Sequence, residues 1–347
     1  MQLISNYLYV IDRDSEAVEN APFNESLALG NYVMNVLNTV IESTGDREYR
    51  FQPESLSMQT WLNKIIKQED VEETCRLIAA RLLSKEIDAQ DQIEHLGKDI
   101  PKGMLIISFV DMQLSENNEQ KVIISKADYN EFIEQTTGEL RTGLPTKKKI
   151  YKAFIANVRS GNIVKRMTYD SNSKIATYWW REFLELDVVR HDEVNTQRAF
   201  DTIVSEVINP VKRQSKQDYL NLWNITLGHF RLDGEFDLDY YRDEILGNYH
   251  SCDNNVSISD LQTRCNNLPN RGDFDRRFTK NSLLLKGKKY KQIISLTNEI
   301  NLTISDYIAN MAEVLQAEEN DAGEKFLKIK SNAGYEYAKR LRTANNE

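Results

Sequence analysis

Two apolar stretches and the polar segment between them decide the fold. Residues 104–111 read MLIISFVD, and residues 121–129 read KVIISKADY. Both are rich in Ile, Val and Phe, which favour strands, and the polar residues 115–120 that join them are typical of a hairpin loop. The sequence therefore predicts an antiparallel pair of strands here.

Further strands and helices are predicted on either side of this hairpin. Residues 2–12 alternate loosely between apolar and polar, and residues 149–158 and 163–169 form a second antiparallel pair. Helical spacing of apolar residues predicts a helix over 27–41, with Ser26 as its N-cap.

A second helix is predicted after Asp70, where Glu73 completes the pattern of a capping box. Residues 1–170 are therefore expected to form an α+β domain, with helices packed on a mainly antiparallel sheet.

The pattern changes in the second half of the chain. Residues 175–265 are predominantly helical in pattern, including a helix over 194–208 that is expected to end near Pro210. After Pro269 the sequence predicts short strands and a terminal helix, at residues 290–296, 300–305, 312–316, 325–330 and 334–342. With 347 residues in all, we expect two domains, 1–173 and 174–347.

Composition excludes several classes of protein. Hydrophobic residues make up 40% of the chain and charged residues 28%, which is typical of a globular protein. The longest apolar runs are far shorter than the roughly 20 residues of a membrane-spanning helix, and the N-terminal stretch does not resemble a signal peptide. Three cysteines are too few for a disulfide framework, so reduced thiols in the cytoplasm are expected.

The charge is distributed unevenly along the chain. Residues 1–144 hold 13 basic and 25 acidic residues, whereas residues 145–347 hold 31 basic and 28 acidic residues. Residues 145–166 contain seven basic residues and no acidic one, and residues 271–292 contain eight basic residues against two acidic ones. An anionic partner for the basic segments is therefore predicted, since cations must be concentrated locally on a protein with a net charge of −9.

Twelve basic residues of these two segments are the candidate contacts to that partner. They are Lys147, Lys148, Lys149, Lys152, Lys165, Arg166, Arg276, Arg277, Lys286, Lys288, Lys289 and Lys291. The acidic residues 1–144 are a candidate surface for a protein partner.

Motifs for catalysis or cofactor binding are scarce. The sequence has no P-loop, no dinucleotide-binding glycine motif and no zinc-protease motif. His250, Cys252 and Cys265 lack the paired spacing of structural zinc sites, so buried thiols are favoured and no metal or cofactor is predicted. One alternative is a Mg²⁺-dependent nuclease, in which Asp111 ends one strand while Glu119 and Lys121 open the next.

The sequence also resembles a known bacterial family. The segment KGKKYKQIISL, the strand residues Leu302-Thr303-Ile304-Ser305 and the hairpin residues Leu327-Lys328-Ile329-Lys330, followed by a short basic helix, are similar to motifs of the nucleoid-associated protein family that includes NdpA and YejK. The resemblance spans the chain at low identity. It implies DNA binding and a location at the nucleoid, and it supplies no catalytic residues.

The resulting hypothesis is a cytoplasmic, non-catalytic homodimer that binds DNA, mainly through phosphate contacts and with weak sequence preference. Besides the nuclease, a second alternative is a protein-interaction component of a bacterial DNA-maintenance or anti-phage defence system.

Overall fold

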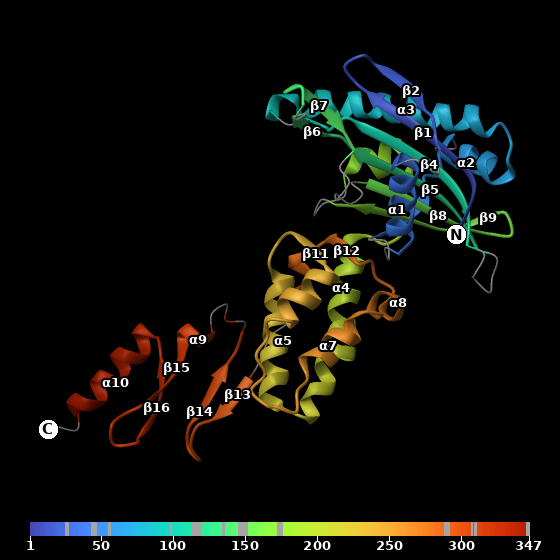
Figure 1. Cartoon of the computed structure of the whole chain (residues 1–347). Coiled ribbons are helices and arrows are strands. Elements are labelled where there is room, and N and C mark those ends of the chain that lie inside the picture. Colours follow the sequence, from blue (N-terminus) through green and yellow to red (C-terminus); the bar gives the residue numbers. More distant parts are fainter. Residues whose placement is uncertain are drawn as a thin grey trace. The chain divides into compact units, whose positions relative to one another are not determined.

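The computed structural model describes the chain apart from twelve short segments. These are residues 25–27, 43–46, 55–56, 98, 113–118, 134–135, 145–151, 172–175, 288–291, 307, 309–310 and 345–347. Ser26 and six of the candidate lysines, at 147–149, 288, 289 and 291, therefore lie outside the described residues. Two compact units are present, and each is described by itself (Figure 1).

The first unit is built on an eight-stranded antiparallel sheet, in the order β10-β3-β9-β8-β5-β4-β1-β2. Its strands are β1 (Gln2–Asp12), β2 (Ala17–Ala21), β3 (Arg47–Phe51), β4 (Gly103–Asp111), β5 (Gln120–Asp128), β8 (Lys152–Arg159), β9 (Asn162–Asp170) and β10 (Leu186–Val188). The predicted hairpin is β4–β5, with Ile107 opposite Ile124. The second predicted pair is β8–β9, so both antiparallel pairs are confirmed.

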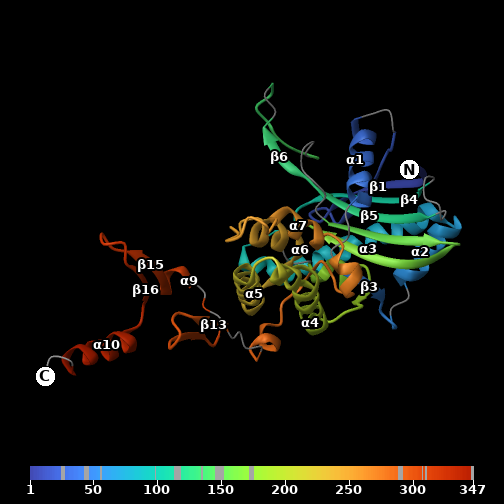
Figure 2. The ribbon, with the colours of Figure 1, turned by 90° about the horizontal axis from the view of Figure 1, so that it is seen from below.

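Helices cover both faces of this sheet, as Figures 1 and 2 show. On one face α2 (Ser57–Lys67) and α3 (Val71–Ile93) pack with the π-helical turn Tyr178–Phe183 against the odd-numbered residues of β4, such as Ile107. On the other face α1 (Ala28–Glu42) packs against the even-numbered residues, such as Ile106. Burial of both faces explains why β4 and β5 read as continuous apolar runs.

The first unit also contains segments from the second half of the sequence. Residues 234–242 and 266–280 belong to it, and they include α8 (Leu268–Gly272) and the antiparallel pair of β11 (Glu235–Asp237) and β12 (Arg277–Thr279). The remaining short elements are α6 (Leu238–Tyr240), the hairpin of β6 (Asn130–Ile133) with β7 (Leu140–Gly143), and the 3-10 turn Glu94–Leu96. The observed division thus differs from a single boundary at residue 173.

The second unit is helical in its first part. It contains the end of α4 (Asp192–Ile203), the π-helical turn Val204–Ile208, the 3-10 turn Asn209–Arg213, α5 (Lys216–Arg231), α7 (Ile258–Cys265) and the 3-10 turn Ser282–Leu285. Tyr241–Leu246 is π-helical and spans the boundary between the units. Phe200 and Phe230 are buried here and pack edge to face, with ring centroids 5.5 Å apart.

The C-terminal part of the second unit is a series of small elements. It comprises β13 (Gln292–Ser295), β14 (Asn301–Ile304), α9 (Met311–Val314), β15 (Leu315–Glu319), β16 (Lys325–Ile329) and α10 (Asn332–Ala344). A turn at Asn320–Gly323 joins β15 to β16 as predicted, and Gly323 takes the left-handed conformation there, with φ 77°. The fold class is therefore α+β: a large antiparallel sheet, a helical middle region and a β-rich end with a terminal helix.

Three local predictions were wrong. Asp70 is left-handed, with φ 44°, and its carboxylate caps no backbone N–H, so the capping box does not form. The helical path before Pro210 does not end at that residue. The π-helical turn Val204–Ile208 continues directly into the 3-10 turn Asn209–Arg213, and proline is tolerated in the first positions of such a turn. The strand predicted over 312–316 begins as the helical turn α9 and becomes extended only from Leu315.

No helix that the structure describes is both long enough and apolar enough to cross a lipid bilayer.

Candidate nucleic-acid interface

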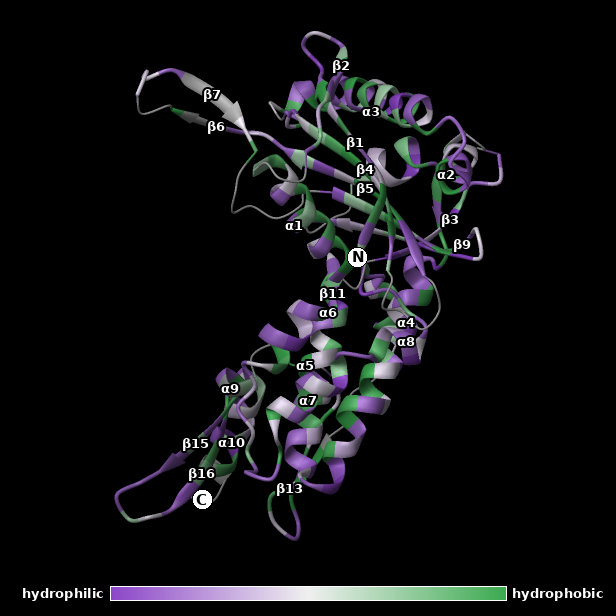
Figure 3. Cartoon of the chain, turned by 45° about the vertical axis from the view of Figure 1, so that its right-hand side comes forward, coloured by the Kyte–Doolittle hydropathy of each residue, from purple (hydrophilic) through white to green (hydrophobic). Residues whose placement is uncertain are grey.

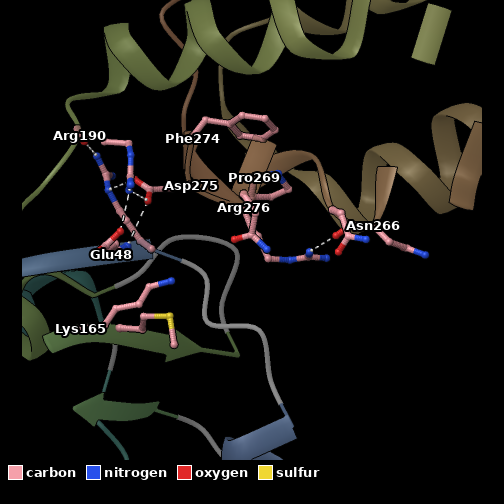
Figure 4. A pocket seen from close by; sticks show the side chains of 12 residues that line it. Glu48, Lys165, Arg190, Asn266, Pro269, Phe274, Asp275 and Arg276 are labelled. Atoms are coloured by element: carbon pink, nitrogen blue, oxygen red, sulfur yellow. Dashed lines mark hydrogen bonds and ion pairs between the residues drawn. The ribbon is translucent and has the colours of Figure 1, made fainter. Parts of the chain in front are cut away.

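A polar pocket of about 270 Å³ opens in the first unit beside the sheet (Figure 4). β3 and β9 line one side of it, and residues 266–276 line the other side. Its charged lining residues are Arg47, Glu48, Lys165, Arg190, Asp275 and Arg276. Lys165 belongs to the first basic segment and Arg276 belongs to the second, so the fold brings the two segments together here.

Lys165 is the cation in this pocket that is most available to a ligand. It is half-buried on β9, and among the residues that the structure describes its ammonium has neither an ion pair nor a hydrogen bond. The strand register places Lys165 opposite Asn157, which lies opposite Lys121 on β5. Lys121 donates a hydrogen bond to Asn157, with Nζ 3.2 Å from Oδ1, so these three residues form a polar row across neighbouring strands.

A β-bulge explains why Lys165 faces this way. The register of the β8–β9 pair shifts between Asn157 and Val158, which leaves Val164 as the extra residue on β9. Ile163 and Arg166 therefore share the sheet face that carries α3, whereas Lys165 and Met167 share the opposite face. Without the bulge, the side chains of β9 would alternate strictly, and Ile163, Lys165 and Met167 would all share one face.

Three asparagines line the pocket, and one of them, Asn266, accepts hydrogen bonds from Arg242 and Arg276. Asn267 and Asn270 flank Pro269 in and before the short helix α8. Neither side chain hydrogen-bonds to any other described residue. Their amide groups can donate N–H bonds to an oxyanion, as the Lys165 ammonium can.

A dense network of ion pairs forms one wall of the pocket (Figure 4). The Arg190 guanidinium lies 2.9 Å from a carboxylate oxygen of Asp275 and 3.0 Å from one of Glu48. Arg47 pairs with Asp192 at 2.9 Å and approaches Asp275 at 3.6 Å. Burial raises the pKa of Asp275, while a hydrogen bond from Asn195 opposes this effect. Arg47 and Arg190 therefore hold the wall together and retain little unpaired charge.

Arg276 and Arg277 are also paired with carboxylates. The guanidiniums of Arg276 and Arg242 both contact the carboxylate of Asp239. Arg277 pairs with Asp237 at 3.2 Å and donates a hydrogen bond to the backbone oxygen of Asp170. Arg277 is thus occupied within the first unit.

The remaining described candidates have different environments. Arg166 lies 5.1 Å from the centre of the Phe51 ring, and burial lowers its pKa although the charge of Glu48 opposes this. Lys286 is exposed, but it belongs to the second unit.

Lys152 is buried, contrary to a role as a surface contact. Its ammonium lies 2.7 Å from the carboxylate of Asp170, which is fully buried. A second buried pair, Lys126 with Glu86 at 2.6 Å, comes from β5 and α3. Because the buried ammonium of Lys152 is already paired with the carboxylate of Asp170, Lys152 is unavailable to a polyanion.

The geometry contradicts the nuclease arrangement. Asp111 follows Phe109 by two residues and so shares the sheet face that carries α3. Lys121 lies two residues from Ile123 and so shares the opposite face, which carries α1. The Nζ of Lys121 lies 3.6 Å from a carboxylate oxygen of Glu119 on that face. The carboxylates of Asp111 and Glu119 therefore lie on opposite faces of the sheet and do not form one metal site in this arrangement.

Metal-ligand clusters are absent from the described part of the chain. Cys75, Cys252 and Cys265 are free thiols, and the first and last of them are buried.

Of the twelve residues that line the pocket, only Lys165 and Arg276 were predicted as site residues, and those missed include Arg47, Arg190, Asn267 and Asn270. Arg47 and Arg190 stand outside the basic segments, and isolated asparagines near a proline are typical of any loop. No signal in the sequence connects them, because the fold alone brings β3, β9 and residues 266–276 together.

Comparison of the sequence with models of protein families and with curated proteins found no match to either.

Proposed function

We propose that this chain is a non-catalytic DNA-associated protein that binds backbone phosphates at the pocket of the first unit. Lys165 supplies the principal charge, Arg276 supplies a second cation whose guanidinium is also paired with Asp239, and Asn267 and Asn270 supply neutral donors. Association with the nucleoid as a homodimer belongs to the same proposal.

One observation carries the proposal. Lys165 and Arg276 come from the two basic segments of an acidic chain, and they line the same pocket. Of the four cationic side chains in the lining, Lys165 is the one without an ion pair among the described residues, and its free ammonium favours an anion as the ligand.

The kind of contact favours phosphate over base recognition. A lysine and amide donors in a shallow polar pocket match phosphate oxygens, which carry no sequence information. Within the described residues, neither basic segment forms a helix long enough to enter a major groove: Lys165 lies on a strand, and Arg276 lies just before one. Weak sequence preference is therefore expected.

Fluorescence anisotropy with a short labelled duplex tests the proposal at low salt. Lys165→Glu should weaken binding by roughly tenfold, because it replaces one attraction to phosphate by a repulsion. Lys67→Glu is the matched control, since Lys67 is an exposed lysine at the end of α2 and makes no ion pair with another described residue. Equal affinities of the two variants would refute the assignment of the pocket.

A further inference from the structure

The C-terminal arm, residues 311–344, exposes an unusual amount of apolar surface. All five residues of β16 are exposed, as are the described side chains of α10. The larger apolar residues there are between 42% and 69% exposed. They are Phe326, Leu327, Ile329, Tyr335, Tyr337 and Leu341.

These side chains are arranged as faces. In the β15–β16 hairpin Leu315 lies opposite Ile329 and Ala317 lies opposite Leu327, so four apolar residues share one side. On α10, Tyr337 and Leu341 are four residues apart and fall on one stripe with Gly334 and Ala338. Figure 3 shows hydrophobic residues in both β16 and α10.

A hairpin of two strands with an open apolar face is marginally stable alone in water. Large exposed apolar patches on folded proteins commonly mark interfaces. The arm is therefore expected to be covered by another molecule.

The distribution of charge on the arm indicates which kind of molecule covers it. Near the tip of the hairpin four acidic residues, Glu318, Glu319, Asp321 and Glu324, outnumber Lys325 and Lys328. From the end of β16 into α10, Lys330, Lys339 and Arg340 outnumber Glu336. Across the hairpin, Lys328 pairs with Glu318. The arm thus carries an acidic end, an apolar middle and a basic end.

We infer that the arm is a self-association surface, whose partner is the same arm of a second copy. In a twofold pair the acidic tip of each copy lies against the basic helix of the other, and the apolar faces are buried between them. An isologous contact needs such a self-complementary patch. This inference locates the interface of the proposed dimer, and it does not depend on DNA binding.

Sedimentation velocity of the full chain over a range of micromolar concentrations tests this inference. The wild type should sediment as a dimer. The double variants Lys330→Glu/Lys339→Glu and Glu319→Lys/Asp321→Lys should each raise the dimer dissociation constant about tenfold or more, because each sets like charges against each other.

Combining all four substitutions should restore association, since the charges are then exchanged and again complementary. Arg213→Glu/Lys216→Glu is the matched control: both residues are exposed in the helical part, and it should leave the dimer unchanged. Tyr337→Ser provides an independent variant, because Tyr337 is 69% exposed and its loss removes no core contact within the chain. It should also weaken the dimer.

A monomeric wild type would overturn the inference. So would a fourfold variant that associates no better than either double variant, or a Tyr337→Ser variant with wild-type association.

Discussion

Lys165 on β9 and Arg276 before β12 line the same pocket, although they come from opposite halves of the sequence. This proximity requires residues 266–280 to join the first unit, which the division of the chain shows. Most of the surrounding arginines are neutralised, so the pocket presents a small number of available donors and charges. Binding of phosphate is therefore expected to be modest and to depend on few residues.

A new negative charge in the pocket should impair DNA binding without removing a lysine. Asn270→Asp places a carboxylate beside the phosphate site, and we expect affinity for duplex DNA to fall about fivefold, corresponding to about 1 kcal/mol. Anisotropy titration measures the effect. Asn254→Asp, an exposed asparagine of the second unit, adds the same charge elsewhere and should bind as wild type does. Indistinguishable affinities would show that Asn270 does not face the ligand.

The buried pair of Lys152 and Asp170 should contribute to stability. Lys152→Met leaves the carboxylate of Asp170 buried without its cation, and we expect a loss of about 3 kcal/mol in the free energy of unfolding. Urea denaturation measures this loss, and adding Asp170→Asn to Lys152→Met should recover part of it. DNA affinity of the folded variant should remain unchanged. A stability loss below about 1 kcal/mol would contradict the role of the pair.

Asp218 should make the stability of the second unit sensitive to acid. Burial alone would raise the pKa of Asp218, but hydrogen bonds from Tyr249 and from the backbone N–H groups of Cys252 and Asp253, together with the contact to Ser215, hold it below its ordinary value of 3.8. Since the pKa of Asp218 is lower in the folded state than in the unfolded state, its stabilisation is complete above the unfolded value of 3.8. The stabilisation is lost as the pH falls through the lower, folded pKa.

The variant Asp218→Asn should cost about 2 kcal/mol at neutral pH, because the charge-assisted hydrogen bonds are weakened. Its difference from wild type should shrink as the pH falls below 3.8. Thermal or urea unfolding over a pH series measures both effects, and a difference that is constant with pH would be evidence against this role.

Gly103 is required by the close approach of β4 to β5. A Cβ at this position would lie 2.3 Å from the backbone oxygen of Ala127, which cannot move without disrupting the sheet. We expect Gly103→Ala to destabilise the first unit by about 2 kcal/mol or more. Gly287→Ala serves as the control, because a Cβ there would meet no described atom within 4 Å. Equal unfolding midpoints for the two variants would show that the strands adjust at little cost.

Much of the fold could be predicted because its signals are local. The runs at β4 and β5 are apolar along their length since both faces of the sheet are covered, and the turn at Asn320–Gly323 contains the glycine that its left-handed conformation favours. By contrast, the conformation of Asp70 and the continuation through Pro210 depend on tertiary context.

The site was only partly predictable for the same reason. Charge runs identified Lys165 and Arg276, but the sequence could not show that Lys152 faces inward while Lys165 faces the pocket. That difference depends on the bulge at Val164 and on the buried carboxylate of Asp170.

The salt dependence of DNA binding tests the central claim most directly. For the wild type, the logarithm of the association constant should fall linearly with the logarithm of the salt concentration, because binding releases counterions from the phosphates that the protein neutralises. For Lys165→Glu the slope should be shallower by about one, and for Lys67→Glu it should equal that of the wild type. A wild-type affinity that does not change with salt, or a Lys165→Glu slope identical to the wild-type slope, would contradict phosphate binding at this pocket.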